Sequence, residues 1–97
     1  MARFNTLIHQ PTRLQIMAAL NALDEDAELD FTALRDLLGI SDGNLATHLR
    51  KLEDAGYITI TKTFVARRPR TYVAITPLGR QAFAGHIQAL KEILGTD

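Results

Sequence analysis

The sequence has 97 residues, a mass of 10.8 kDa and a formal net charge of zero at pH 7, which suits one small domain and leaves no room for a second. It contains no cysteine, which excludes disulfides, thiolate metal sites and thiol-based redox sensing. No stretch approaches the ~20 apolar residues of a membrane span, and no long apolar run opens the chain, so we expect a soluble, cytoplasmic protein without a membrane partner.

The first predicted element is a helix over residues 13–23. Pro11 is tolerated in the first turn of a helix, so we expect the helix to begin near it. Residues 24–28 then form a polar connection. Apolar side chains recur in the helix at a spacing that predicts one buried face: Ile16, Ala19, Leu20 and Leu23, widened by Leu14 and Met17.

A short strand over residues 29–31 and a second helix follow. Thr32 offers a side-chain oxygen that can cap the start of this helix. Gly39 can take the left-handed conformation that commonly ends a helix. We therefore expect the second helix between these two residues.

The third helix has a polar face that is typical of DNA recognition. Ser41 supplies an oxygen for its unpaired amides, so the helix is expected to start near Asp42. Leu45, Leu49 and Leu52 recur at i, i+4 and i+7 and form a buried stripe. Two helices joined by a glycine turn indicate a helix-turn-helix. The positions that face away from the stripe are mostly short and polar: Asp42, Gly43, Asn44, Thr47, His48 and Lys51.

Two strands joined by a basic loop are predicted next. Residues 57–64 are rich in β-branched and aromatic side chains, with apolar and polar positions alternating. Residues 71–76 provide the matching return strand of a hairpin. We expect the loop over residues 65–70 to be a stiff turn that carries three guanidinium groups, because it contains Arg67, Arg68, Pro69 and Arg70.

A last helix is predicted from Pro77 to about Leu94. Thr76 reads as its N-cap, and proline is favoured at the first helical position. Apolar side chains recur along it at i, i+4, i+7 and i+11: Phe83, Ile87, Leu90 and Leu94.

This order of helices, strands and basic loop is the winged-helix arrangement, and the chain resembles small winged-helix transcriptional regulators near the MarR and ArsR groups. The resemblance is carried by residues 38–49, 52–58, 64–71 and 76–80, and it covers nearly the whole chain. It implies an α+β, mainly α fold in one domain over residues 1–97. The expected parts are a winged helix-turn-helix with its two helices at about 32–55, the wing at about 57–76, and a C-terminal dimerisation helix at about 77–94.

The resemblance also implies a sequence-specific regulator that binds double-stranded DNA with its third helix. We assign base contacts to side chains that can reach base edges: Asn44, Thr47 and His48. We assign phosphate or sugar contacts to Ser41, Arg50 and Lys51. Asp42 either supports the helix dipole or accepts from a cytosine amine. Gly43 either permits close approach of the backbone to DNA or occupies a tolerant first turn.

The wing is the second candidate DNA contact. Arg67, Arg68 and Arg70 are expected to enter or straddle a narrow minor groove, where negative potential is concentrated. Lys62 and Tyr72, near the base of the wing, are weaker candidates for phosphate contact. The alternative is a solvated, charged hairpin loop.

In the regulators that the chain resembles, terminal helices form a two-fold dimer interface. We therefore expect a homodimer on a pseudo-palindromic operator, with recognition helices ~34 to 36 Å apart. The alternative is that the stripe closes the protomer's own core. Repression is favoured because a bare domain of this size has little surface for recruiting polymerase. The expected interface comprises Phe83, Ile87, Leu90 and Leu94, with Phe4, Leu7 and Ile8 as candidates to join it.

The zero net charge favours a competing interpretation, a winged-helix protein–protein interaction module that does not bind DNA. The distribution of charge argues against it. Five of the eleven acidic residues lie within 24–30, whereas residues 42–80 carry seven basic residues against three acidic ones. We therefore expect a positive face opposite an acidic edge.

The sequence indicates neither an enzyme nor a metal protein. It lacks a nucleophile with a nearby base and a phosphate-binding glycine loop. Its three histidines, His9, His48 and His86, are scattered without ligand-like spacing, so we expect no metal and no cofactor. The resemblance allows a small-molecule effector between the dimerisation helices and the DNA-binding core, although no ligand signature is visible.

Overall fold

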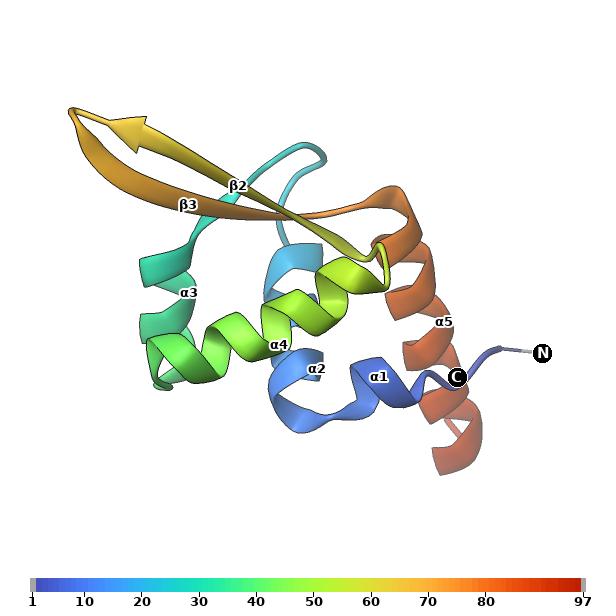
Figure 1. Ribbon diagram of the computed structural model, residues 1–97. Coiled ribbons are helices and arrows are strands. Elements are labelled where there is room, and N and C mark those ends of the chain that lie inside the picture. Colours follow the sequence, from blue (N-terminus) through green and yellow to red (C-terminus); the bar gives the residue numbers. More distant parts are fainter. Residues whose placement is uncertain (1, 97) are drawn as a thin grey trace.

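The structure, a computed structural model, describes residues 2–96, which form five helices and a small antiparallel sheet (Figure 1). The mainly helical winged-helix arrangement predicted from the sequence is confirmed. Within residues 2–96, no helix combines the length and apolar character needed to cross a bilayer. The elements are α1 (Thr6–His9), α2 (Pro11–Asn21), β1 (Leu29–Asp30), α3 (Phe31–Leu38), α4 (Asp42–Asp54), β2 (Ile58–Val65), β3 (Arg68–Ile75) and α5 (Pro77–Leu94).

The sequence patterns do not predict α1, because a helix of four residues is too short to show a periodicity. Asn5 caps it by accepting a hydrogen bond from the Ile8 amide at 3.0 Å, and its side-chain amide donates to the Tyr57 hydroxyl at 2.9 Å. Ile8 has no exposed surface and belongs to the core. It therefore has nothing to offer a second copy, and its assignment to a dimer interface is corrected.

The helices of the helix-turn-helix begin and end close to the predicted residues, with one correction. The N-cap of α3 is Asp30, whose carboxylate accepts from the Ala33 amide at 3.3 Å, and not Thr32. The strand β1 ends at Asp30 and α3 starts at the next residue, so the cap lies at that junction. Gly39 ends α3 with a φ of 65°, as the sequence predicts.

The hairpin turn is tighter than predicted. The strands β2 and β3 pair in register as far as Val65 and Arg68, so the turn consists of Ala66 and Arg67 alone. Both have positive φ, 51° and 66°, which is the geometry of a two-residue hairpin turn that matches the twist of its strands. The predicted loop over residues 65–70 is therefore wrong, and most of it is strand.

Pro69 is tolerated in β3 because the sheet has only two strands at that position. The sheet has the order β1-β3-β2, but β1 pairs only with Tyr72 and Val73 of β3. Pro69, opposite Phe64 of β2, lies beyond β1, where β3 is an edge strand. An edge position is where proline is found in sheets. Figure 1 shows the consequence, a long two-stranded wing that projects away from the helices.

The hydrophobic core lies between the helices and the base of the sheet. It is formed by side chains that are at most 2% exposed: Ile8, Ile16, Met17, Leu20, Leu34, Leu45, Leu49, Leu52, Ile58 and Val73. The predicted stripe of α4 is thus confirmed as its buried face.

The buried face of α5 differs from the predicted stripe. Its buried positions are Gly79, His86 and Ala89, and Phe83 packs against the core from beside them. Leu94, at the end of the predicted stripe, is 74% exposed. The predicted apolar stripe of α5 therefore has two parts. Phe83 contacts the core, whereas Leu94, at the end of the helix, is exposed.

The start of α5 passes very close to the backbone after α4. A Cβ atom at Gly79 would overlap the carbonyl oxygen of Tyr57, which already accepts the Thr76 amide at 3.0 Å. Both the Gly79 position and the Tyr57 carbonyl belong to the backbone, so neither can move aside as a flexible side chain would. Glycine at this position lets α5 dock against the segment that joins α4 to β2.

We expect Gly79→Ala to lower the free energy of unfolding by about 3 kcal/mol, as overpacking of a tight site does. Gly85→Ala is the matched control on the same helix, because its Cβ would meet nothing nearer than 3.9 Å. That change should raise stability by up to about 1 kcal/mol through helix propensity alone. Urea unfolding of both variants checks the prediction, and equal effects in the two would contradict it.

Candidate nucleic-acid interface

The polar face of α4 is built as the sequence predicts. The Ser41 hydroxyl accepts a hydrogen bond from the Asn44 amide at 3.1 Å and so starts the helix. Asn44, Thr47 and Lys51 are exposed on the side away from the core. The Thr47 hydroxyl donates to the carbonyl oxygen of Gly43 at 2.9 Å. Its proton is therefore used within the helix, and the side chain presents a methyl group and an acceptor oxygen.

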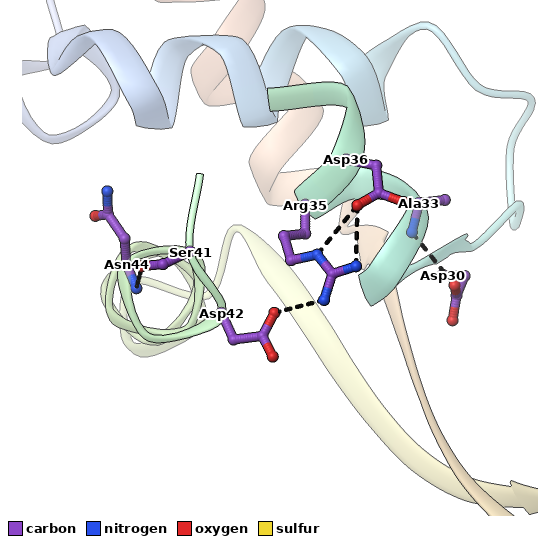
Figure 2. A network of polar contacts seen from close by, with 7 residues as sticks. All are labelled: Asp30, Ala33, Arg35, Asp36, Ser41, Asp42 and Asn44. Atoms are coloured by element: carbon purple, nitrogen blue, oxygen red, sulfur yellow. Dashed lines mark hydrogen bonds and ion pairs between the residues drawn. The ribbon is translucent and has the colours of Figure 1, made fainter. Parts of the chain in front are cut away.

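Asp42 does not stand alone at the start of this face. Figure 2 shows Arg35 of α3 between two carboxylates, at 2.9 Å from Asp42 and 3.0 Å from Asp36. Hydrogen bonds to Asp42 and then to Asp36 raise the pKa of Arg35 above its ordinary value. The guanidinium partly offsets the charge that would otherwise repel a phosphate. The pattern of α4 does not predict a role for Arg35, which comes from the preceding helix.

The wing carries its arginines differently from the prediction. Only Arg67 lies in the turn, and Arg68 and Arg70 lie in β3, two residues apart and therefore on one face of the hairpin. Arg70 forms an ion pair of 3.7 Å with Asp30, the cap of α3. The predicted cluster of three guanidinium groups at a stiff turn is corrected to an exposed row along one strand.

The two weaker wing candidates fall on opposite faces. Tyr72 pairs with Thr61 and shares the face of Arg70, whereas Lys62 pairs with Thr71 on the other face. Tyr72 is half-buried and Lys62 is exposed. The structure therefore separates them.

A groove of about 510 Å³ runs between α4 and the wing. Arg50 of α4 and Lys62 of β2 place a positive charge on each wall, and Glu53 is the acidic residue among the lining side chains. The groove is lined by Phe31, Ala46, Leu49, Arg50, Glu53, Ile60, Lys62 and Thr71.

His48 lies at the edge of the buried stripe and contacts α2. Its Nδ1 is 3.0 Å from Nη1 of Arg13, whose Nε donates to the carbonyl oxygen of Leu7 at 2.6 Å. Burial, then the charge of Arg13, then that of Lys51 lower the pKa of His48. The sequence does not predict a role for Arg13, because nothing in a local pattern links residues 13 and 48.

His9 and His86, far apart in the sequence, meet in the structure. Asn5 donates its backbone amide to Nδ1 of His86 at 2.9 Å, so the His86 proton lies on Nε2. That Nε2 is 3.2 Å from Nδ1 of His9, which accepts from it. The Phe4 ring lies 4.8 Å from each imidazole. Each group in this chain donates to the next, from the Asn5 amide to His86 and from His86 to His9. The chain links the N-terminal segment to α5.

Protonation of His86 would break this chain, so stability should fall in acid. Burial first, and the charge of His9 second, lower the pKa of His86. The unfolded chain then binds more protons just below its ordinary pKa of about 6.5, and stability rises with pH through that range. The contribution is complete above about pH 7 and is lost as pH falls from about 6.5 toward the folded pKa.

The measurement is the urea midpoint at several pH values, for the natural chain and for His86→Asn. Asparagine keeps an acceptor for the Asn5 amide but does not titrate. We expect a flatter pH dependence in the variant, with a remaining slope from His48, whose pKa is lowered too. An unchanged slope in the variant would contradict the role of His86.

Known proteins share this arrangement. Residues 12–94 match the family described as winged helix DNA-binding domain. The chain is 33% identical over 90 residues to an uncharacterised protein of Methanocaldococcus jannaschii, and the match covers 93% of this chain and 90% of that protein.

Solved structures agree with the family match. A transcriptional regulator homologue from Pyrococcus horikoshii OT3 is 31% identical, with a TM-score of 0.81 over 92% of this chain and 85% of that one. A protein of Enterococcus faecalis V583 assigned to the MarR family shares the fold at 24% identity, with a TM-score of 0.69 over 93% of this chain and 77% of that one. The resemblance drawn from the sequence is confirmed, and the chain belongs to the winged helix DNA-binding domain family.

Proposed function

We propose that the protein is a sequence-specific transcriptional regulator that binds duplex DNA with α4 in the major groove and the wing at the adjacent minor groove. One observation carries the proposal: Arg50 of α4 and Lys62 of β2 both line the groove between α4 and the wing. A helix in a major groove and a wing in the next minor groove flank one sugar–phosphate strand. The groove would hold that strand, with a cation on each side of it.

The contacts follow from this placement. Asn44 and Thr47 would meet base edges, and Lys51 and the Ser41 end of the helix would meet phosphates. Arg67, at the wing turn, is the guanidinium placed furthest out, so it would reach the minor groove, and Arg68 would contact the backbone beside it.

The position of the acidic loop supports DNA binding over protein docking. Glu25 and Asp26 lie beside Ile75, Pro77 and Arg80, at the opposite end of β3 from the wing turn. These two carboxylates therefore lie away from the surface between α4 and the wing turn, whereas Asp30, at the end of the acidic segment, pairs with Arg70 of the wing at 3.7 Å. A positive face with Glu25 and Asp26 away from it would orient the molecule on DNA.

The proposal includes a homodimer formed by the end of α5. Ile93 and Leu94 are 67% and 74% exposed, and Phe4, near the same helix, is 40% exposed. Uncovered apolar side chains at one helix end support an isologous interface. The dimer would place two copies of α4 about one turn of DNA apart, ~34 to 36 Å, on a pseudo-palindromic operator. Such a dimer would act as a repressor in the cytoplasm, by occupying a promoter.

The test is selection from a pool of randomised duplexes, followed by binding measurements across a salt series. We expect enrichment of an inverted repeat, bound about a thousandfold or more tighter than scrambled DNA and with a steep salt dependence. Equal, weak binding to all duplexes would overturn the proposal and favour protein docking.

A further inference from the structure

Arg13 holds His48 from one side in a fixed orientation. The guanidinium is itself fixed at two points, by its Nε bond to the Leu7 carbonyl at 2.6 Å and its Nη1 bond to His48 at 3.0 Å. The backbone amide of Arg13 donates to the Gln10 side chain at 2.9 Å, within the first turn of α2. Two side-chain contacts therefore position the guanidinium against α4, and the third fixes the backbone that carries it.

This contact decides which imidazole nitrogen of His48 carries the proton. A guanidinium has only donors, so Nδ1 of His48 must accept, and the proton of the neutral ring lies on Nε2. Within residues 2–96, no buried side-chain nitrogen or oxygen lacks a hydrogen-bond partner. Nε2 of His48 has no such bond among these residues, so it reaches solvent as a donor.

The donor lies on the same side of the recognition helix as two exposed polar residues. Asn44, His48 and Lys51 stand at i, i+4 and i+7 of α4 and so form one column along the helix. The column borders the buried stripe on the side of α2, where Arg13 lies. Nε2 of His48 is therefore presented between an amide and an ammonium group on the proposed DNA face.

We propose that His48 reads a hydrogen-bond acceptor on the major-groove edge of a base, and that Arg13 is the positioning residue that fixes its tautomer. The inference rests on the proposed function. Guanine, adenine and thymine all present acceptors in the major groove, whereas cytosine presents a donor. His48 would therefore reject cytosine at one position of the site.

The first arm of the test needs no DNA. Long-range ¹⁵N–¹H NMR correlation of the free, full-length protein, above the ordinary histidine pKa of about 6.5, reports which ring nitrogen is protonated. We expect a single form with the proton on Nε2 of His48. A proton on Nδ1 would overturn the inference whether or not the protein binds DNA.

The second arm uses the duplexes that the natural chain enriches from a randomised pool. We expect His48→Ala to weaken binding to the selected duplex about 5- to 150-fold and to scrambled DNA much less. His48→Gln should retain more affinity, since its amide can donate from near the position of Nε2. Equal losses on both DNAs would mean a phosphate contact and would overturn base reading.

The role of Arg13 is separated from a direct DNA contact by a double-mutant cycle. If Arg13 acts through His48, Arg13→Leu weakens selective binding but adds nothing in the His48→Ala background, and the salt dependence is unchanged. An additive loss with a shallower salt dependence would show that Arg13 contacts phosphate itself. If the Arg13→Leu variant does not fold, Arg13→Lys, which keeps the charge, takes its place in the cycle. If the natural chain enriches no sequence, the proposed function fails, and the NMR arm still reports on the tautomer.

Discussion

Replacement of Ile93 and Leu94 by glutamate is expected to make the protein monomeric and to lower its affinity for the selected duplex by about 10²- to 10⁴-fold. Both side chains are more than two-thirds exposed at the end of α5, so the change leaves the core of the protomer untouched. Four carboxylates would meet across a two-fold axis, because an isologous interface doubles every substitution. The affinity falls because each half-site is then bound independently.

Analytical ultracentrifugation gives the oligomeric state, and titration of the selected duplex gives the affinity. Leu78→Glu is the matched control, since Leu78 is 51% exposed on the same helix but lies at its start. That variant should remain dimeric. A double variant that stays dimeric, or a natural chain that is monomeric at micromolar concentration, would contradict an interface at this end of α5.

The sequence predicted those elements whose cause is local. Ser41 and the Leu45, Leu49 and Leu52 stripe define α4 within a dozen residues, and Thr76 with Pro77 opens α5 in the same way. Caps and helical periodicity depend on neighbours along the chain, so a single sequence contains them.

The predictions from the sequence are wrong where strand pairing determines the local structure. The register that brings Val65 opposite Arg68 is set by contacts all along the hairpin, and it shortens the expected loop to two residues. Similarly, the place where β1 ends makes Asp30 the cap of α3 in place of Thr32. Neither outcome is fixed by the residues that flank it.

The candidate site was predicted in its residue types but not in its supports. Asn44, Thr47 and His48 were assigned as base contacts from the face of one helix. Arg35 and Arg13, which hold Asp42 and His48, come from other helices, and residues 13 and 48 are 35 positions apart. Contacts of this kind depend on how α2, α3 and α4 pack together, which a pattern along one helix does not report.

The strongest electrostatic prediction concerns DNA binding by variants of the residues that line the groove between α4 and the wing. Arg50→Ala and Lys62→Ala should each weaken binding to any duplex about tenfold near 0.1 M salt, and should each lower the slope of log affinity against log salt by about 0.9. The double variant should show about twice the change in slope. Glu53→Gln, in the same groove, should strengthen binding, because it removes the negative charge that faces the bound strand.

The salt series of these variants separates a strand in the groove from a diffuse positive field. Lys91→Ala on α5 removes one charge as well, but Lys91 lies in the last turn of the helix, away from the groove. Under the proposal, the slope of log affinity against log salt for Lys91→Ala equals that of the natural chain. If it changes the slope as much as Lys62→Ala does, the protein senses only total charge, and the groove is not the path of the sugar–phosphate strand. A change confined to Arg50 and Lys62 would fix how the duplex lies across the molecule, because one strand would then pass between the helix that reads the bases and the wing that reaches the next groove.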